Sequence, residues 1–467
     1  MKKWLLVGAV MAAVALPFSP ARAESPKSKL NVLLIISDDL CNDLGCYGAP
    51  VKTPNIDRLA ERGVKLDRIY CQFPLCGPSR CSFMSGLRPD TEGVLGNGQT
   101  VRFKLKNLVT LPELFRHNGY YSARVGKVYH LGIPGQVGTP GPDDPQSWDY
   151  AFNPKGNEFP TKDDGDEFDP DPKNGQSFRR NLLKGDGHEQ ADFQSADEAI
   201  RLLNQHKDQP FFLAVGFIRP HVPEVAPKSF FDLYDVNQIK LPEIPANDFA
   251  SKPPLAFHAP ADMGMSESDR RESIRAYHAT TSFMDAQAGR VLDELHRLNL
   301  DEKTVIVFMS DHGYLLGQHH AWQKTMLFEE TCRVPMIYVT PDMKTRGQSA
   351  RGIAESVDMY PTVAELCGLT APKELQGKSL VPLLEDPSKP FKSAAFTQLH
   401  RNKNGDGRSI RSDRFRYTEW NAGKDGMELY DHNSDPAEYH NLAKDPAYAD
   451  TLSDLQKQLH AHYNHHE

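Results

Sequence analysis

The sequence predicts an α/β protein in which helices flank a large, mostly parallel sheet, with a smaller α+β subdomain at the C-terminus. Nearly continuous apolar runs are typical of parallel strands buried on both faces, and the chain has three of them, at 31–36, 210–217 and 304–309. Helix-like stretches separate these runs, and such alternation indicates a sheet covered on both sides. From about residue 380 the pattern changes to short alternating stretches, such as 415–420, which indicate antiparallel strands.

The helices are predicted from their caps and from apolar periodicity. Thr53 and Pro54 are suited to the start of a short helix, as N-cap and first-turn residue. Ser266 with Asp269 resembles a capping box, which would open a long helix reaching about Leu298. Further helix-like stretches lie at 110–118, 191–203 and 449–462, and a fourth apolar run lies at 334–339.

The expected division of the chain is a signal peptide over 1–23, an α/β domain over 24–379 and the α+β subdomain over 380–467. Residues 134–187 are rich in Pro, Gly, Asp and Lys, which predicts a long surface insertion with little regular structure. No internal repeat is evident.

The N-terminus has the three parts of a secretory signal peptide. Two lysines follow Met1, an apolar run extends from Trp4 to about Phe18, and Ala21-Arg22-Ala23 forms an A-x-A cleavage site. A membrane anchor is the alternative, but the run is short for a bilayer span. We expect a periplasmic or secreted protein with no stable membrane anchor.

The net charge of the chain restricts which kinds of molecule it can bind. The formal net charge of −8 argues against general nucleic-acid binding, which needs a basic footprint. An anionic substrate stays open, because a local basic pocket can lie within an acidic protein.

The stretch from Cys76 to Gly86 is the first candidate for chemistry. Pro78 fixes its own φ and biases Gly77 towards an extended shape, which predicts that Cys76 lies on a defined turn. Arg80 supplies a permanently charged set of donors suited to an oxyanion. A structural cysteine is the alternative. The chain has seven cysteines, an odd number that leaves one thiol to explain.

Acidic residues follow two of the predicted strands. Asp38 and Asp39 end the first, and Asp311 and His312 follow the third. Ligands of α/β sheets bind beyond the carboxyl ends of the strands, and adjacent carboxylates repel unless a cation neutralises them. Oxygen ligands favour a hard cation such as Ca²⁺ or Mg²⁺. The alternative is that Asp38 or Asp39 only caps the next element.

Four basic residues complete the candidates: Lys127, His130, His221 and Lys324. Each alone is more often a surface group. Together with Arg80 they could line an anion pocket beside a cation.

These motifs carry a family resemblance that spans nearly all of the chain after the signal peptide. Cys76-Gly77-Pro78-Ser79-Arg80 with Gly86 resembles the signature of the formylglycine-dependent (type I) sulfatases. Other stretches similar to that family are 37–39, 45–48, 53–57, 88–91, 126–130, 220–223, 310–313 and 428–442. Within the family the chain most resembles the iduronate-2-sulfatases, through Asp311-His312 and the Lys-x-x-His spacing of Lys127 and His130.

The resemblance implies an alkaline-phosphatase-like sulfatase fold and a modified nucleophile. A formylglycine-generating enzyme or an anaerobic maturase would oxidise Cys76 to formylglycine. One hydroxyl of its hydrate would attack sulfur, and collapse of the resulting ester would release sulfate. Ca²⁺, in preference to Mg²⁺, would be held by five residues, Asp38, Asp39, Cys76, Asp311 and His312, and would act as a Lewis acid.

The resemblance also implies a role for each basic residue. Arg80 and Lys127 would stabilise developing negative charge, and Lys324 would grip the sulfate. His130 would be the base that triggers collapse, and His221 the acid at the leaving oxygen.

Three hypotheses for function follow. The first is an exported sulfatase that removes sulfate esters from a sulfated sugar or polysaccharide fragment. The second is a phosphonate or phosphodiester hydrolase of the same superfamily. The third is a catalytically silent carbohydrate-binding protein in which Cys76 stays a thiol.

Overall fold

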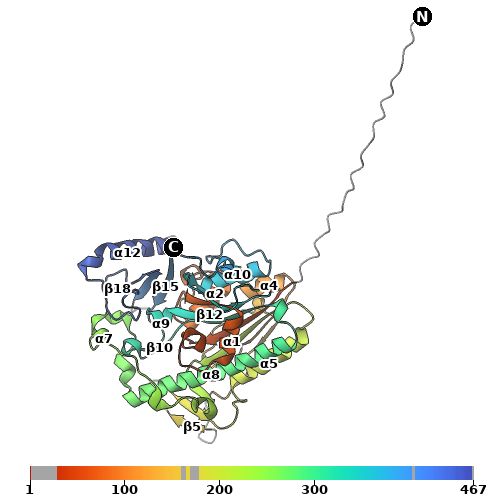
Figure 1. Ribbon diagram of the computed structural model, residues 1–467, viewed down its shortest axis with the longest axis horizontal. Coiled ribbons are helices and arrows are strands. Elements are labelled where there is room, and N and C mark those ends of the chain that lie inside the picture. The colour runs from red at the N-terminus through yellow and green to blue at the C-terminus, as the bar shows by residue number, and fades with distance from the viewer. Residues whose placement is uncertain (2–28, 159–164, 169–177, 402–404, 465–467) are drawn as a thin grey trace.

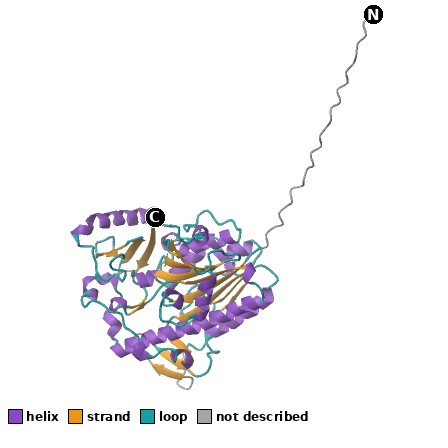
Figure 2. Ribbon diagram, viewed as in Figure 1, coloured by secondary structure: helices purple, strands orange, loops and turns teal. Residues whose placement is uncertain are grey.

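The protein is built around one large sheet with helices on both faces (Figures 1 and 2). A computed structural model describes Met1 and residues 29–158, 165–168, 178–401 and 405–464. The predicted signal peptide therefore lies, apart from Met1, outside the described residues. No helix among the described residues has the length and apolar character needed to cross a membrane.

The large sheet has nine strands in the order β13-β2-β12-β9-β1-β7-β3-β4, with β14 also paired to β2. Their bounds are β1 Asn31–Asp38, β2 Val64–Tyr70, β3 Tyr121–Gly126, β4 Tyr150–Phe152, β7 Phe211–Pro220, β9 Thr304–Ser310, β12 Arg333–Val339, β13 Gln348–Ala350 and β14 Ala354–Glu355. Only β12 runs antiparallel to its neighbours, β2 and β9, so the predicted mostly parallel sheet is confirmed.

Strand β1 lies at the centre and is buried along its whole length. It pairs in parallel with β7 and β9, so that Leu34 lies opposite both Ala214 and Val307. Alternate residues enter different cores because successive side chains of a strand point to opposite faces. Leu34 belongs to one core and Leu33 to the other. This two-sided burial explains the continuous apolar run in the sequence.

Helices cover the two faces in separate groups (Figure 1). One core contains residues of α1 (Pro54–Arg62), α5 (Ala191–His206) and α8 (Glu267–Arg297). The opposite core contains residues of α2 (Cys76–Ser85), α4 (Leu111–His117) and α10 (Met359–Leu366). The predicted capping box at the start of α8 is present, because Ser266 Oγ accepts from Asp269 N at 3.2 Å. An unpredicted capping box, formed by Thr110 and Glu113, begins α4.

The C-terminal part forms its own four-stranded antiparallel sheet, as predicted. The strands are β15 Ala394–His400, β16 Asp406–Ser412, β17 Phe415–Trp420 and β18 Met427–Asp431. Helix α12 (Ala449–Asn464) packs on this sheet, with Leu455 and Leu459 against Ile410 and Tyr417. Before it, Leu383 of α11 (Val381–Glu385) packs in the core of the large domain. The boundary at residue 380 stays a prediction.

The insertion over residues 134–187 contains short strands where little regular structure was expected. Strand β4 joins the edge of the large sheet. Strands β5 (Gly165–Phe168) and β6 (Arg180–Leu183) form a separate three-stranded sheet with β8 (Glu224–Pro227). Pairing with β8, which lies far along the chain, stabilises β6 and could not be read from local composition. Residues 159–164 and 169–177 lie outside the described part of the chain.

The remaining short helices connect these elements. They are α3 (Pro89–Glu92), α6 (Lys228–Phe231), α7 (Asp248–Ser251) and α9 (Glu329–Cys332).

Candidate active site

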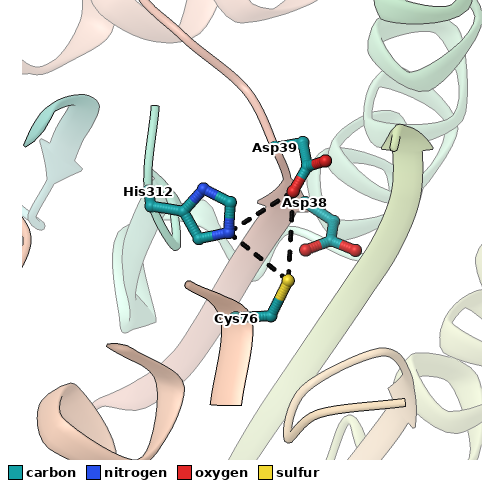
Figure 3. A group of neighbouring side chains, drawn as sticks. All are labelled: Asp38, Asp39, Cys76 and His312. Atoms are coloured by element: carbon teal, nitrogen blue, oxygen red, sulfur yellow. Dashed lines mark hydrogen bonds and ion pairs between the residues drawn. The ribbon is translucent and has the colours of Figure 1, made fainter. Parts of the chain in front are cut away.

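The site lies where neighbouring strands of the large sheet end. Parallel neighbours β1, β7, β9 and β3 end beside one another, so the residues that follow them meet at one edge. Asp38 is the last residue of β1 and Asp39 follows it. Asp311 and His312 follow β9, His221 follows β7, and Lys127 follows β3. Figure 3 shows Asp38, Asp39, Cys76 and His312 pointing toward one another.

Asp39 adopts an uncommon backbone conformation, with φ at 61°. A left-handed conformation at a non-glycine residue is strained and persists only where its surroundings hold it. Tyr277 of α8 provides such a hold, since its hydroxyl donates to Asp39 O at 2.7 Å. The backbone N–H of Asp39 donates to Asp311 Oδ1 at 3.2 Å. Tyr277 was not predicted, because on a buried helix it looks like any other core residue.

Cys76 is the first residue of helix α2, and the predicted turn is therefore wrong. Proline is tolerated in the first turn of a helix, where its missing N–H has no intrahelical partner. Gly77 is required for packing, because a Cβ there would lie 2.9 Å from the Cα of Asn97. A residue before proline usually avoids the helical conformation, partly because its Cβ would collide with the proline ring. Gly77 has no Cβ, so the chain can be helical here.

The Cys76 thiol is 1% exposed and surrounded by charge. Its Sγ lies 3.2 Å from Lys324 Nζ, 3.3 Å from His312 Nε2 and 3.9 Å from Asp39 Oδ1. Burial and the Asp38 charge oppose ionisation of the thiol, but Lys324 and Lys127 outweigh them and lower the pKa of Cys76. All seven cysteines are free in this structure.

Arg80, one helical turn after Cys76, holds the carboxylates in place. It donates to Asp311 Oδ2 and Asp38 Oδ1, each at 2.9 Å, and to the carbonyls of Lys127 at 2.5 Å and Val128 at 3.1 Å. Its side chain is fully buried. These bonds use most of its donors, which suits orientation of Asp38 and Asp311 more directly than contact with a substrate.

The two lysines each pair with one carboxylate. Lys127 Nζ forms an ion pair with Asp38 Oδ2, and Lys324 Nζ donates to Asp39 Oδ1 at 2.5 Å. Burial opposes ionisation of Asp38, yet Lys127 and Arg80 hold its pKa well below the usual range.

The two histidines beside the site are neutral at pH 7. Burial first, and Lys127 second, lower the pKa of His130 to about 3. Burial and Lys324 also lower the pKa of His221. The Nδ1 of His221 lies 2.6 Å from Val222 O and its Nε2 lies 3.9 Å from Asp39 Oδ2. An Nδ1–H donated to that carbonyl leaves Nε2 as an acceptor, so His221 must gain a proton before it can donate one.

The acidic residues fit a hard cation. Ligand atoms of Asp38, Asp39, Cys76 and His312 all lie within 4.8 Å of one another. Asp38 Oδ2 is paired with Lys127, whereas Asp39 Oδ2 is buried without a hydrogen bond. Burial raises the pKa of Asp39 to about 7. A cation would add charge neutralisation beside this pair of adjacent carboxylates and give Asp39 Oδ2 the partner it lacks. Asp311 is more fully engaged, since it accepts from Arg80, Asp39 N and His312 N.

The orientation of His312 also suits a ligand. Its Nδ1 lies 2.9 Å from Gly313 O, which leaves Nε2 directed at Cys76 and Asp39. Burial opposes protonation of this ring, but Asp311, Cys76 and Asp39 raise the pKa of His312 to about 9. A bound cation would displace that proton, because a ligating imidazole is neutral.

A second group of possible ligands, Glu329, His432 and Glu438, has another explanation. Arg416 donates to Glu438 Oε1 and to Glu329 Oε2, each at 2.5 Å. The carboxylates are therefore neutralised by a cation of the chain itself. Glu438 Oε2 also accepts from Glu329 N at 2.9 Å. This cluster links the C-terminal sheet to helix α9 of the large domain.

Comparison with known proteins gives the same result as the motifs. The sulfatase family matches residues 30–369, and the C-terminal region of N-sulphoglucosamine sulphohydrolase matches residues 317–465. A sulfatase of Formosa agariphila is 33% identical over 453 residues, which cover 92% of this chain and 86% of that protein. Iduronate 2-sulfatase of Homo sapiens is 31% identical over 539 residues, which cover 94% of this chain and 96% of that protein.

A solved structure extends the likeness to the fold. The phosphonate monoester hydrolase of Silicibacter pomeroyi superposes with a TM-score of 0.79 at 23% identity, over 94% of this chain and 96% of that one. The predicted alkaline-phosphatase-like architecture and the predicted family are both confirmed. The chain belongs to the sulfatase family, whose members hydrolyse sulfate esters.

Proposed function

We propose that this protein is an exported sulfatase that removes sulfate from a sulfated sugar or polysaccharide fragment, in the manner of an iduronate-2-sulfatase. The observation that carries the proposal is the placement of Cys76 among Lys324, His312 and the Asp38–Asp39 pair. Similarity to iduronate 2-sulfatase over most of both chains supports the substrate class.

Conversion of Cys76 to formylglycine by a separate maturing enzyme would supply the oxygen nucleophile that attacks sulfur. Asp38, Asp39, Asp311, His312 and the residue at 76 would hold Ca²⁺, which would polarise the sulfate as a Lewis acid. The closeness of the Asp38, Asp39, Cys76 and His312 ligand atoms and the buried Asp39 Oδ2, which has no hydrogen bond, support this assignment.

The chain's own basic residues would orient the sulfate and move protons. Lys324 would bind a sulfate oxygen from its position beside residue 76, and Lys127 would balance charge at Asp38. Arg80 would keep Asp38 and Asp311 in place. The Nδ1 of His130 has no hydrogen-bond partner among the described residues, which leaves this nitrogen free to accept a proton. His221 would protonate the leaving oxygen after taking up a proton itself.

The first experiment is peptide mass spectrometry of residue 76 in protein exported by its native host, followed by assay of sulfate release. Formylglycine together with release of sulfate from a disaccharide bearing a 2-O-sulfated uronic acid is the expected result. An unmodified thiol in every preparation would refute the mechanism and support the carbohydrate-binding alternative.

Relative rates on model substrates separate the two hydrolase hypotheses. The matured enzyme is expected to cleave an aryl sulfate faster than an aryl phosphodiester or phosphonate. The reverse order would favour the phosphonate or phosphodiester hydrolase.

A further inference from the structure

Lys324 lies in a segment whose backbone is unfavourable on its own. The segment joins β10 (Leu315–Leu316) and β11 (Trp322–Gln323) to α9. Four of its non-glycine residues have positive φ, namely His319, His320, Gln323 and Thr325, and the last two flank Lys324 on either side. Left-handed conformations at such residues cost energy and are kept only where other parts of the structure fix them.

The flank after Lys324 is fixed by Arg401, which directly follows β15 in the C-terminal sheet. Its Nη2 donates to Thr325 O at 2.6 Å. Its Nη1 donates to Phe257 O at 2.8 Å and also to Leu255 O. The guanidinium lies 5.1 Å from the ring centroid of Trp420. One rigid, planar group thus ties backbone atoms of two segments, 255–257 and 325, to the end of β15.

No ion pair within the described part of the chain explains the presence of Arg401. Among the described residues no carboxylate lies within ion-pair distance of it, and burial lowers the pKa of Arg401 to about 10. Burying a cation costs free energy unless its hydrogen bonds compensate for the lost contact with water. Its Nη1 and Nη2 donate to carbonyl groups, while its Nε has no hydrogen bond among the described residues. The Thr325 carbonyl is next in sequence to Lys324, the residue that contacts Cys76.

We propose that Arg401 is a positioning residue: by holding Thr325 O, it keeps the Lys324 ammonium 3.2 Å from Cys76 Sγ and 2.5 Å from Asp39 Oδ1. The C-terminal subdomain is then part of the catalytic apparatus, although none of the predicted site residues comes from it. This inference rests on the proposed role of Lys324 in sulfate hydrolysis.

The test is a double-mutant cycle between Arg401→Met and Lys324→Met, assayed with an aryl sulfate and normalised to the formylglycine fraction of each variant. Misplacement of a reacting group by about 1 Å can cost about 100-fold, so Arg401→Met is expected to lower kcat by about 10- to 100-fold. In the Lys324→Met background the same change should alter kcat by less than about twofold, because the group that Arg401 positions is already absent. A full additional loss in the double variant would overturn the proposal.

Two further variants keep the outcome clear. Arg401→Lys keeps the charge but lacks the planar fork, so it should lose kcat nearly as strongly as Arg401→Met; full activity would overturn the proposal. Arg414→Met removes a half-exposed arginine of the same subdomain, which pairs with Asp431, and should keep the wild-type kcat.

Crystal structures provide a readout that needs no activity. The Lys324 Nζ should move away from Asp39 in both Arg401 variants and stay in place in Arg414→Met. If Lys324 does not move, the inference about Arg401 is overturned, but the proposed function is not affected. A displaced Lys324 in a protein whose wild type hydrolyses no sulfate ester would uphold the inference about geometry and refute the proposed function.

Discussion

Replacing Arg416 by methionine should destabilise the protein strongly, and most at neutral pH. Arg416 is 1% exposed and neutralises two buried carboxylates, Glu329 and Glu438. Each bond to a charged partner is worth about 1.5–3 kcal/mol, and breaking a buried pair costs about 3–5 kcal/mol. Glu329 keeps Arg411 at 3.4 Å, and Glu438 keeps His432 at 2.8 Å. We therefore expect the lower part of that range, about 3 kcal/mol.

The pH dependence follows from the two carboxylates. Burial opposes their ionisation, but the arginines hold the pKa of Glu329 well below its usual range, and Arg416 and His432 lower that of Glu438 to about 2. In the wild type this stabilisation is present above the unfolded pKa of about 4.5 and is lost as the pH falls through about 2. Without Arg416 the pKa values of Glu329 and Glu438 in the folded state rise. In the variant these carboxylates therefore take up protons already at about pH 5, which removes the cost of burying their charge.

The assay is chemical denaturation of wild type and Arg416→Met at about pH 7.5 and about pH 5, where the difference in unfolding free energy should shrink. The control is Arg414→Met, whose partner Asp431 is buried but whose own side chain is 50% exposed. A half-exposed pair is worth about 1 kcal/mol or less. A loss in Arg416→Met no larger than in this control, or one that grows towards acid, would refute the reasoning.

Three further changes test the site and the fold. Cys76→Ala should abolish sulfate release while the melting temperature stays within about 2 °C, and Cys367→Ala, remote from the cation ligands, should keep activity; turnover by Cys76→Ala would rule out the nucleophile. Elemental analysis should find about one Ca²⁺ per chain, and a chelator should remove both the metal and the activity. The Asp39→Asn variant should lose the ion. Full metal occupancy in Asp39→Asn would exclude Asp39 as a ligand. Thr110→Ala removes the capping box of α4 and should lower the unfolding free energy by about 1 kcal/mol, measured by denaturation, and an unchanged value would show that the cap contributes nothing.

The buried strands were predictable because burial on both faces leaves a continuous apolar run, as in β1, β7 and β9. Strand β2 was not predicted, since Lys65 and Asp67 interrupt its apolar residues and pair with each other at 2.7 Å. Strand β12 was found, but its antiparallel direction depends on long-range pairing that no local pattern records. Strand direction is a property of the assembled sheet.

The candidate site divides in the same way. The strand ends and the Cys76 motif could be located because their residue types are unusual at those places. The inward orientation of Arg80 and the bond from Arg401 to Thr325 could not, because they join residues far apart in the chain. Arg401 carries no local signal at all, since an arginine after a strand is common on protein surfaces.

The central position of β1 sets the order in which the protein can assemble. The first strand to be synthesised has partners that follow much later, as the contact of Asn31 with Phe211 spans 180 residues and that of Ser37 with Ser310 spans 273. At about 5–20 residues per second, synthesis of the second partner takes on the order of 10–50 s. Until then His312 and Lys324, which contact Cys76 in the finished fold, have not been synthesised, so Cys76 cannot reach its final exposure of 1%. The maturing enzyme proposed above would have that interval in which to reach the thiol.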